Sequence, residues 1–500
     1  MALYTTLDLS YPSLLLLCTI LLLTVRALRS HLSSYRMRKG CQPPPSIPQK
    51  DPFFGLDIIY GRFTETYEKQ SRDTIARGLF TKYGHTFQSF PYGVAEIFTE
   101  APEHVKAIYG TDFESFGVGP MRSFGLKPLA GDGLMSTDGA VWKAHRSLLT
   151  PIFAQAANHQ HLFEQHVARL LALIPEDGST VDLQPLFDRL ALDSSSDILF
   201  GESTLTLLPE TPADAMKFLD AYNYSLQGVG MRMVLPFWDF LSRDPKFWSS
   251  CKDAQDFVDR ILDKVMDTAT SASQEQKYSV AYGLASLGQD RVKIRDELLG
   301  LFLPVHDAIA TPLTNMFFNL ARNPQAWTKL QKEISTVGSA KLTPKLVKSL
   351  RYLNCVINET MRLYPGISAN ERIALRDTVL PTGGGPNGTS PIFVKKGVKV
   401  VIWFASMSRR KDLWGNDAET WRPERWEGDF KPDRWINLSF GAGSRMCPAS
   451  DLGVTQIAIT TIKILQKFKG IENRDPVKEF VDRWRVTTVS KNGAQVGLIL

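Results

Sequence analysis

The chain has 500 residues, of which 43% are hydrophobic and 22% charged. This composition is that of a globular protein with enough chain for a large core, and it excludes a disordered or fibrous protein. The net charge of +6 is modest for this length and its cations are dispersed, so we expect no nucleic-acid partner.

The N-terminal region has the pattern of a membrane anchor. Residues 9–25 contain no charged residue and as a helix would span roughly 26 Å, near the lower limit for a bilayer. Only Asp8 precedes this segment and five arginines and lysines follow by residue 39, so the positive-inside rule predicts a cytosolic main domain. A cleaved signal peptide is the alternative, but it would need a basic segment first and a small-residue cleavage site.

These features predict four segments. We expect a short lumenal N-terminus over residues 1–8, a transmembrane anchor over 9–28 and a basic, proline-rich linker over 29–50. Residues 51–500 show no repeat and no long linker, so we predict one catalytic domain. The chain would then be a single-pass membrane protein with its main domain in the cytosol.

The main domain is predicted to be mainly α with a small β portion, an α+β fold. Residues 51–135 suggest short strands and loops. Helical periodicity then dominates, with predicted helices at residues 160–173, 213–227, 254–269, 291–321, 343–363 and 452–468. Residues 391–402 alternate as strands do. The G-x-G-x-x-G match at residues 383–388 lacks a following helix and contains Pro386, so we predict a hairpin turn and not a dinucleotide site.

Residues 440–447 carry the strongest chemical signal, Phe-Gly-Ala-Gly-Ser-Arg-Met-Cys. The chain has five cysteines and no C-x-x-C pair, which argues against disulfides and structural zinc. A lone cysteine can bind iron as a thiolate when its loop donates amide hydrogen bonds to the sulfur. Gly443 permits a tight turn, and Arg445 supplies a cation for an anionic cofactor. The alternative is a buried cysteine that merely follows a glycine turn.

This octapeptide resembles the cysteine loop of the cytochrome P450 family, Phe-x-x-Gly-x-Arg-x-Cys. The resemblance implies the cytochrome P450 fold and haem b, with Cys447 as the axial ligand of the iron and Phe440 and Arg445 in the cofactor-binding loop. Glu359-x-x-Arg362 and then Trp421 to Trp426 precede the loop in the family's order. The family pattern implies a buried structural network of Glu359, Arg362 and Arg425. Alone, the Glu–Arg pair would indicate a common surface ion pair.

Further cofactor contacts follow from the same resemblance. Trp142 and Arg146 match the family's Trp-x-x-x-Arg helix, and their spacing places both on one helix face. Arg372 falls where the family has another arginine that binds a haem propionate. We therefore predict that Trp142, Arg146 and Arg372 bind the cofactor.

The helix that the family places over the haem departs from its pattern here. In the family, this helix carries an acidic residue followed by a threonine, and these two residues manage the delivery of protons to bound dioxygen. This chain has Asp307 followed by Ala308 at the matching positions. Thr311 lies four residues after Asp307 on the same helix face, and Pro312 leaves the Ala308 carbonyl without its helical donor, where a water could bind. We predict Asp307 and Thr311 as catalytic residues. The alternatives are that Pro304 and Pro312 only bend the helix and that His306 is a helix residue beside a polar neighbour.

The overall resemblance is to the fungal microsomal alkane and fatty-acid hydroxylase branch, through residues 131–133, 320–324 and 382–385. It implies a haem-thiolate monooxygenase that oxidises an apolar small molecule with dioxygen and electrons from an NADPH–cytochrome P450 reductase. The divergent helix suggests fungal secondary metabolism. One alternative, favoured by Ala308, is desaturation, ring expansion or rearrangement; another is a non-catalytic haem-binding protein.

Overall fold

The computed structural model describes residues 40–51, 53–61, 71–157, 159–235, 243–269, 278–484 and 487–500, with Thr19, Leu21, Thr24 and Val25 as isolated positions. The predicted anchor at residues 9–28 therefore falls almost wholly outside the described residues. Among those that are described, no helix combines the length and the apolar character needed to span a membrane.

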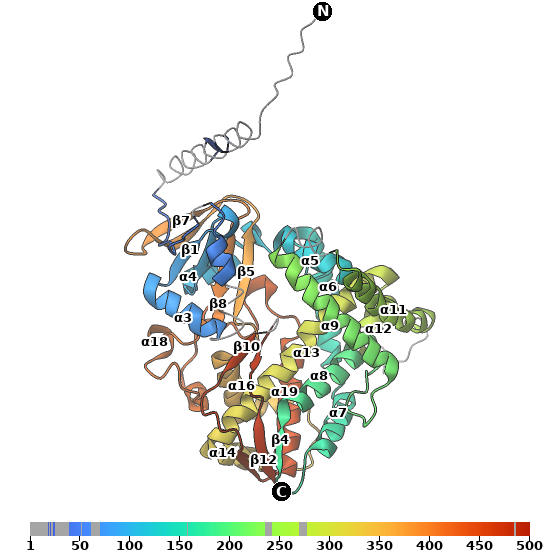
Figure 1. Ribbon diagram of the computed structural model, residues 1–500. Coiled ribbons are helices and arrows are strands. Elements are labelled where there is room, and N and C mark those ends of the chain that lie inside the picture. Colours follow the sequence, from blue (N-terminus) through green and yellow to red (C-terminus); the bar gives the residue numbers. More distant parts are fainter. Residues whose placement is uncertain are drawn as a thin grey trace, which may run out of the picture.

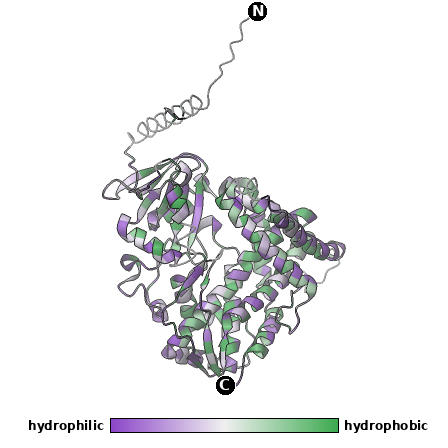
Figure 2. Cartoon of the chain, viewed as in Figure 1, coloured by the Kyte–Doolittle hydropathy of each residue, from purple (hydrophilic) through white to green (hydrophobic). Residues whose placement is uncertain are grey.

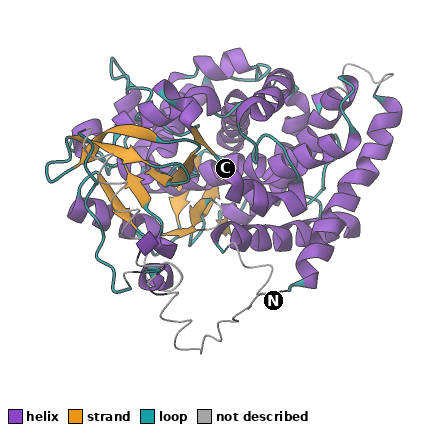
Figure 3. Ribbon diagram, turned by 90° about the horizontal axis from the view of Figure 1, so that it is seen from above, coloured by secondary structure: helices purple, strands orange, loops and turns teal. Residues whose placement is uncertain are grey.

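The described chain is mainly helical, as the sequence predicts (Figures 1 and 3). The strands gather on one side of the molecule and helices fill the remainder (Figure 3). The helices are α3 (Arg72–Tyr83), α4 (Pro102–Lys106), α5 (Gly119–Ala130), α6 (Gly139–Ala156), α7 (Gln160–Leu173), α8 (Leu183–Phe200), α9 (Ala213–Val234), α11 (Pro245–Thr268), α12 (Val280–Ser286), α13 (Arg291–Arg322), α14 (Pro324–Ser335), α15 (Pro344–Ser349), α16 (Arg351–Leu363), α17 (Phe404–Met407), α18 (Lys411–Trp414) and α19 (Ser450–Lys467).

The largest sheet has five strands in the order β1-β2-β8-β5-β3. Its members are β1 (Thr86–Ser89), β2 (Glu96–Thr99), β8 (Lys399–Trp403), β5 (Ala369–Ala374) and β3 (Phe116–Gly117), and only β2 and β8 pair in parallel. The smaller sheets are formed by β4 (Thr180–Asp182), β12 (Gln495–Ile499) and β9 (Gly470–Asn473), by β10 (Asp482–Trp484) and β11 (Thr488–Ser490), and by β6 (Thr378–Gly384) and β7 (Ser390–Val394). The β6–β7 pair confirms the predicted hairpin at the glycine-rich segment.

Helix α13 runs through the centre of the molecule. Its first half supplies Leu298 and Phe302 to a core shared with α6, α9, α11 and α12. Its second half supplies Leu313 and Phe317 to a core shared with α7, α8, α14, α16 and α19. Peripheral helices alternate hydrophobic and hydrophilic residues, as helices with one buried face must (Figure 2). α13 therefore contributes residues to both of these hydrophobic cores.

Several predicted boundaries were wrong. α11 begins at Pro245 and not at residue 254, α9 continues to Val234 and not only to residue 227, and the strand expected over residues 391–402 is two strands, β7 and β8. Residues 51–135 contain α3 and α5 in addition to strands, and the helix expected over residues 343–363 is two helices separated at Leu350. Glu333 of α14 explains the new start, because its carboxylate accepts hydrogen bonds from the backbone N–H groups of Tyr352 and Leu353, each at 2.8 Å. A carboxylate at a helix N-terminus satisfies orphan donors and suits the helix dipole.

Candidate active site: a cysteine loop beside a cluster of arginines

The cysteine loop is a tight turn that leads into α19. The Cys447 N–H donates to the carbonyl of Phe440 at 2.9 Å, and the Met446 N–H donates to that of Gly443 at 3.1 Å. Gly443 has φ +61°, and a Cβ there would collide with the carbonyl of Tyr109. Only glycine allows the loop to lie this close to the neighbouring backbone. The phenyl ring of Phe440 is partly buried against the main core and fixes the start of the loop.

Opposing interactions act on the pKa of the Cys447 thiol. Burial raises the pKa of the Cys447 thiol, while a hydrogen bond from the Ala449 N–H and the charge of Arg146 oppose that rise. Both opposing groups favour the anion, so the loop already carries the interactions that a thiolate needs. A metal cation at the sulfur would stabilise the anion more strongly than either group and would complete the deprotonation.

A cluster of cations, called the arginine cluster below, lies around Tyr109, a residue far from the cysteine loop in sequence. Its cationic members are Arg122, Arg372 and Arg445. The Arg372 guanidinium lies 4.9 Å from the Tyr109 ring centroid, and the Arg445 guanidinium lies 4.4 Å from that of Trp142. Burial lowers the pKa of Arg445 to about 10, and the positive charges of Arg372 and Arg122 act in the same direction, while Asp138 opposes them. The three guanidinium groups are therefore close enough to repel one another.

This cluster has unused hydrogen-bonding groups and surplus positive charge. Within the part of the chain that the structure describes, the Nε atoms of Arg122 and Arg445 and the hydroxyl of Tyr109 are buried and have no hydrogen-bond partner. Arg445 pairs with Asp138, but Arg372 donates only to the Asn370 side chain and a backbone carbonyl. Because unpaired buried donors and like charges are costly, the residues fit a buried anionic group. The two propionates of haem have that chemistry, and Cys447 lies on the same loop as Arg445.

The predicted cofactor residues do not all lie in the cluster. Trp142 and Arg372 do, but Arg146 donates to the carbonyl of Met446 at 2.6 Å, and its charge acts on the Cys447 thiol. The structure thus places Arg146 beside the cysteine. Arg122 and Tyr109 belong to the cluster and were missed from sequence, because neither is part of a recognisable local motif.

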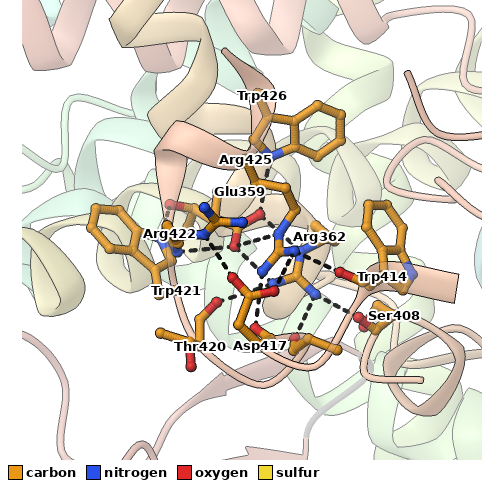
Figure 4. Close-up of polar contacts among 12 residues, drawn as sticks. Glu359, Arg362, Ser408, Trp414, Asp417, Thr420, Trp421, Arg422, Arg425 and Trp426 are labelled. Atoms are coloured by element: carbon orange, nitrogen blue, oxygen red, sulfur yellow. Dashed lines mark hydrogen bonds and ion pairs between the residues drawn. The ribbon is translucent and has the colours of Figure 1, made fainter. Parts of the chain in front are cut away.

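The three residues of the predicted structural network come together in the interior (Figure 4). Arg362 makes two hydrogen bonds to the Glu359 carboxylate, at 2.7 and 2.8 Å, and both side chains are fully buried. Arg425 approaches the same carboxylate at 3.4 Å. Trp426 and the Arg422 N–H satisfy the remaining lone pairs at 2.9 and 3.0 Å.

The two guanidiniums use their other N–H groups to hold the surrounding loop. Arg362 reaches the carbonyls of Ser408, Ala418 and Thr420, and Arg425 reaches that of Trp414 and the side chain of Asp417. The network therefore joins α16 to the segment that leads into the cysteine loop. A surface ion pair, the alternative from sequence, does not describe this geometry.

Asp307 lies on a stretch of α13 that differs from its surroundings. Residues 303–308 are half-buried, whereas residues 309–321 are buried. One carboxylate oxygen accepts from His306 Nδ1 at 2.7 Å and the other from the Thr487 hydroxyl at 2.6 Å. Burial alone would lower the pKa of His306, but Asp307, assisted by Asp188, raises it above its ordinary value. Thr311 is buried in the helix, and the hydroxyl at Asp307 comes from Thr487, which sequence reasoning missed.

A cysteine in a glycine turn, beside a cluster of arginines with surplus positive charge, suits a haem-thiolate protein. The chain matches the sequence model of the family Cytochrome P450 over residues 45–496. It is 35% identical to "Cytochrome P450 monooxygenase himC" of Aspergillus japonicus, over 92% of this chain and 84% of that protein. It is 34% identical to "Cytochrome P450 monooxygenase FPY7" of Fusarium mangiferae, over 95% and 92% of the two chains.

A further relative is "Cytochrome P450 52A1" of Candida tropicalis, 35% identical over 82% of this chain and 79% of that protein. The chain belongs to the cytochrome P450 family. It is a monooxygenase, an oxidoreductase that uses thiolate-ligated haem b.

Proposed function

We propose that this enzyme oxidises an apolar small molecule with dioxygen, using electrons from an NADPH–cytochrome P450 reductase. The observation that carries the proposal is the cysteine loop beside the arginine cluster, which supplies a thiolate ligand and a site for two carboxylates. When bound there, a thiolate-ligated haem supplies the chemistry of dioxygen activation. Leu303, Val305 and Ala308 leave apolar surface half-buried around Asp307, which suits an apolar substrate.

At position 308 the chain has an alanine where the family has a threonine. This difference supports a specialised substrate, as in fungal secondary metabolism, and it also supports a reaction other than hydroxylation. Desaturation, ring expansion or rearrangement would place no oxygen atom from dioxygen in the product. Incubation of apolar candidate substrates with reductase, NADPH and isotopically labelled dioxygen separates the two. Label in the product supports hydroxylation; an oxidised product without label favours the second type, and haem uptake without turnover would indicate a non-catalytic haem protein.

We propose that Asp307 handles protons in this reaction and that Thr487 supplies its hydroxyl partner. The carboxylate bridges the Thr487 hydroxyl and the His306 ring, so a proton donor contacts each oxygen. Thr311, the partner expected from sequence, is buried one helical turn away. The hydroxyl that helix position 308 lacks would thus come from the C-terminal segment.

Replacing Thr487 by valine should uncouple the enzyme. The hydroxyl that contacts Asp307 is lost while side-chain volume is kept, so hydrogen peroxide released per NADPH should rise and product formation should fall about tenfold or more. The matched control is Thr311→Val. If Thr311→Val uncouples the enzyme and Thr487→Val does not, the assignment of the hydroxyl partner is wrong.

A basic groove supports docking of an acidic electron donor. The groove, of about 1290 Å³, is lined by the outer side of the cysteine loop, including Gly443 and Met446, and by α14 and α16. The exposed cations of its lining are Lys329, Lys332, Arg351, Lys431 and Arg434, which outnumber the acidic lining residues Glu333 and Glu427. Complementary charge raises the rate of association more than the final affinity. We propose that the reductase docks over this groove.

Reversing two of these charges should slow reduction by the reductase. For Lys332→Glu with Lys431→Glu, we expect the rate of formation of the reduced carbon-monoxide complex to fall about tenfold at low salt, with less dependence on ionic strength. Lys395→Glu with Lys396→Glu reverses two exposed charges in the β7–β8 turn and should leave the rate unchanged. Equal rates for both double variants would refute docking at the groove.

We propose that the enzyme is held at the endoplasmic reticulum membrane by an anchor at residues 9–28, with residues 29–50 as linker and 51–500 as the cytosolic catalytic domain. Exposed apolar side chains support membrane contact beyond the anchor: Phe53 and Phe54 are 54% exposed and Tyr60 is 70% exposed. They follow the linker, and the Phe53 carbonyl lies against Gly93, whose neighbours Tyr92 and Val94 are also exposed. Contiguous exposed apolar surface marks a contact site.

A chain that begins at residue 40 should still bind phospholipid vesicles, though more weakly than the full chain. The exposed aromatic residues would enter the interface, each adding apolar burial. Flotation of the truncated protein with vesicles measures this, with Phe53→Ser and Tyr60→Ser combined as the test variant. Binding that is unaffected by this double substitution would contradict the proposed contact.

A further inference from the structure

The hydroxyl of Tyr222 is inserted into the central helix. Tyr222 lies on α9, and its ring contacts Phe302 of α13. Its hydroxyl donates to the Leu299 carbonyl at 2.8 Å and accepts from the Leu303 N–H at 3.2 Å. Those two backbone groups are four residues apart, and in a regular α-helix they bond to one another. A side chain from another helix therefore bridges one rung of α13.

Pro304 gives the physical reason for the insertion. A proline inside a helix has no N–H, and its ring presses on the carbonyl four residues earlier, which opens the preceding turn. Leu303 immediately precedes Pro304, so its rung is at the opened turn. An opened turn in the interior would leave a buried donor and a buried acceptor unsatisfied, which is unfavourable. One phenol hydroxyl, which both donates and accepts, satisfies both groups.

The ring of Tyr222 is held so that its hydroxyl stays in this position. The side chain is 3% exposed, and its ring packs edge-on against Phe302 at 5.1 Å and lies 5.7 Å from Phe218. Burial raises the pKa of Tyr222, and the charge of Asp307 adds to that rise, so the phenol stays protonated at physiological pH. Asp307 follows Leu303 by four residues, which is one turn further along α13.

We propose that Tyr222 is a positioning residue: its hydroxyl holds the opened turn of α13 and thereby sets the position of Asp307. The part that concerns Asp307 rests on the proposed proton-handling role, whereas the part that concerns the turn stands on the hydrogen bonds alone. Tyr222 also ties α9 to the half-buried segment of α13 at residues 303–308. A displacement of α9 would reach that segment through this hydroxyl and through the ring contacts of Tyr222 and Phe218 with Phe302.

The test removes only the hydroxyl, in Tyr222→Phe, and uses Tyr224→Phe as the matched control. Tyr224 is on the same helix, but its hydroxyl donates to Asp244, away from α13. In the haem-loaded enzyme, amide hydrogen exchange at Leu303 should become on the order of tenfold faster in Tyr222→Phe and stay unchanged in Tyr224→Phe. The infrared stretching frequency of bound carbon monoxide, which senses nearby polar groups, should shift in Tyr222→Phe alone.

The exchange rate at Leu303 and the carbon-monoxide frequency test different parts of the proposal. Unchanged exchange at Leu303 would show that the hydroxyl does not hold the turn. Faster exchange with an unshifted carbon-monoxide frequency would reduce Tyr222 to a structural residue and overturn its positioning role. Neither readout depends on turnover, so failure of Asp307 as a proton-handling group would show separately, as unchanged coupling in Asp307→Asn.

A second variant covers the case in which Tyr222→Phe does not fold. Pro304→Ala removes the ring and restores an N–H, so the Leu303 N–H can bond directly to the Leu299 carbonyl. In the Pro304→Ala background, Tyr222→Phe should then have little effect on folding or on exchange at Leu303. An equally large effect in both backgrounds would refute the link between Pro304 and the inserted hydroxyl.

Discussion

Replacing Cys447 by alanine should abolish the thiolate-type Soret band of the reduced carbon-monoxide complex. The sulfur receives the Ala449 N–H and lies near Arg146, both of which favour an anion, and no other residue of the loop can supply a thiolate. Cys447→His should retain haem but shift the band to the position typical of a nitrogen ligand, because imidazole is neutral and does not push electron density as thiolate does.

The control for this prediction is Cys251→Ala. Cys251 is 2% exposed in the core beside α9 and α11, so its replacement costs some stability but touches nothing in the cysteine loop. It should keep a full thiolate-type band. A thiolate-type band that persists in Cys447→Ala would overturn the assignment of the axial ligand.

Replacing Arg362 by methionine should be the most destabilising single change outside the cysteine loop. The substitution keeps much of the side-chain length but leaves the fully buried Glu359 carboxylate without its bidentate partner. Removal of one member of a buried ion pair typically costs about 3–5 kcal/mol. We expect a lower unfolding midpoint in denaturant and little haem-loaded protein. Arg362→Lys should not rescue it, because a lysine cannot reproduce the fork of hydrogen bonds to Glu359.

Lys143→Met provides the comparison on the surface. Lys143 pairs with Glu114 at 2.8 Å, but the two side chains are 57% and 59% exposed. Such pairs contribute about 0–1 kcal/mol, so the unfolding midpoint should barely move. If Arg362→Met proved as mild as Lys143→Met, the network would not have the structural role that we propose.

Local patterns predicted much of the secondary structure. α7 begins and ends at the predicted residues, and α13 is one residue longer than predicted. The glycine-rich hairpin was also predicted, because Pro386 and the extended segment after it act over a few residues. α3 and α5 were not predicted from local patterns. α5 contains glycines and Pro128, which are poor helix formers, so packing and not local preference stabilises this helix.

The cysteine loop could be predicted from sequence because its chemistry is contiguous. Phe440, Gly443, Arg445 and Cys447 act within one turn, where sequence spacing and spatial proximity coincide. The remaining site residues depend on contacts between distant segments. Thr487 meets Asp307 across 180 positions, and Tyr222 enters α13 across 81 positions.

The sequence by itself determined the family, the cysteine loop and most helices, because periodicity, turns and short motifs express short-range physics. Only the tertiary structure decided which hydroxyl serves Asp307, that Arg122 and Tyr109 join the arginine cluster, and that Arg146 lies beside the sulfur. Those contacts arise when independently formed helices pack, and the packing satisfies buried donors and charges with whichever residue is brought within reach. From the sequence, Pro304 was considered only as a residue that bends the helix; the fold decided that the Tyr222 hydroxyl enters the turn before it.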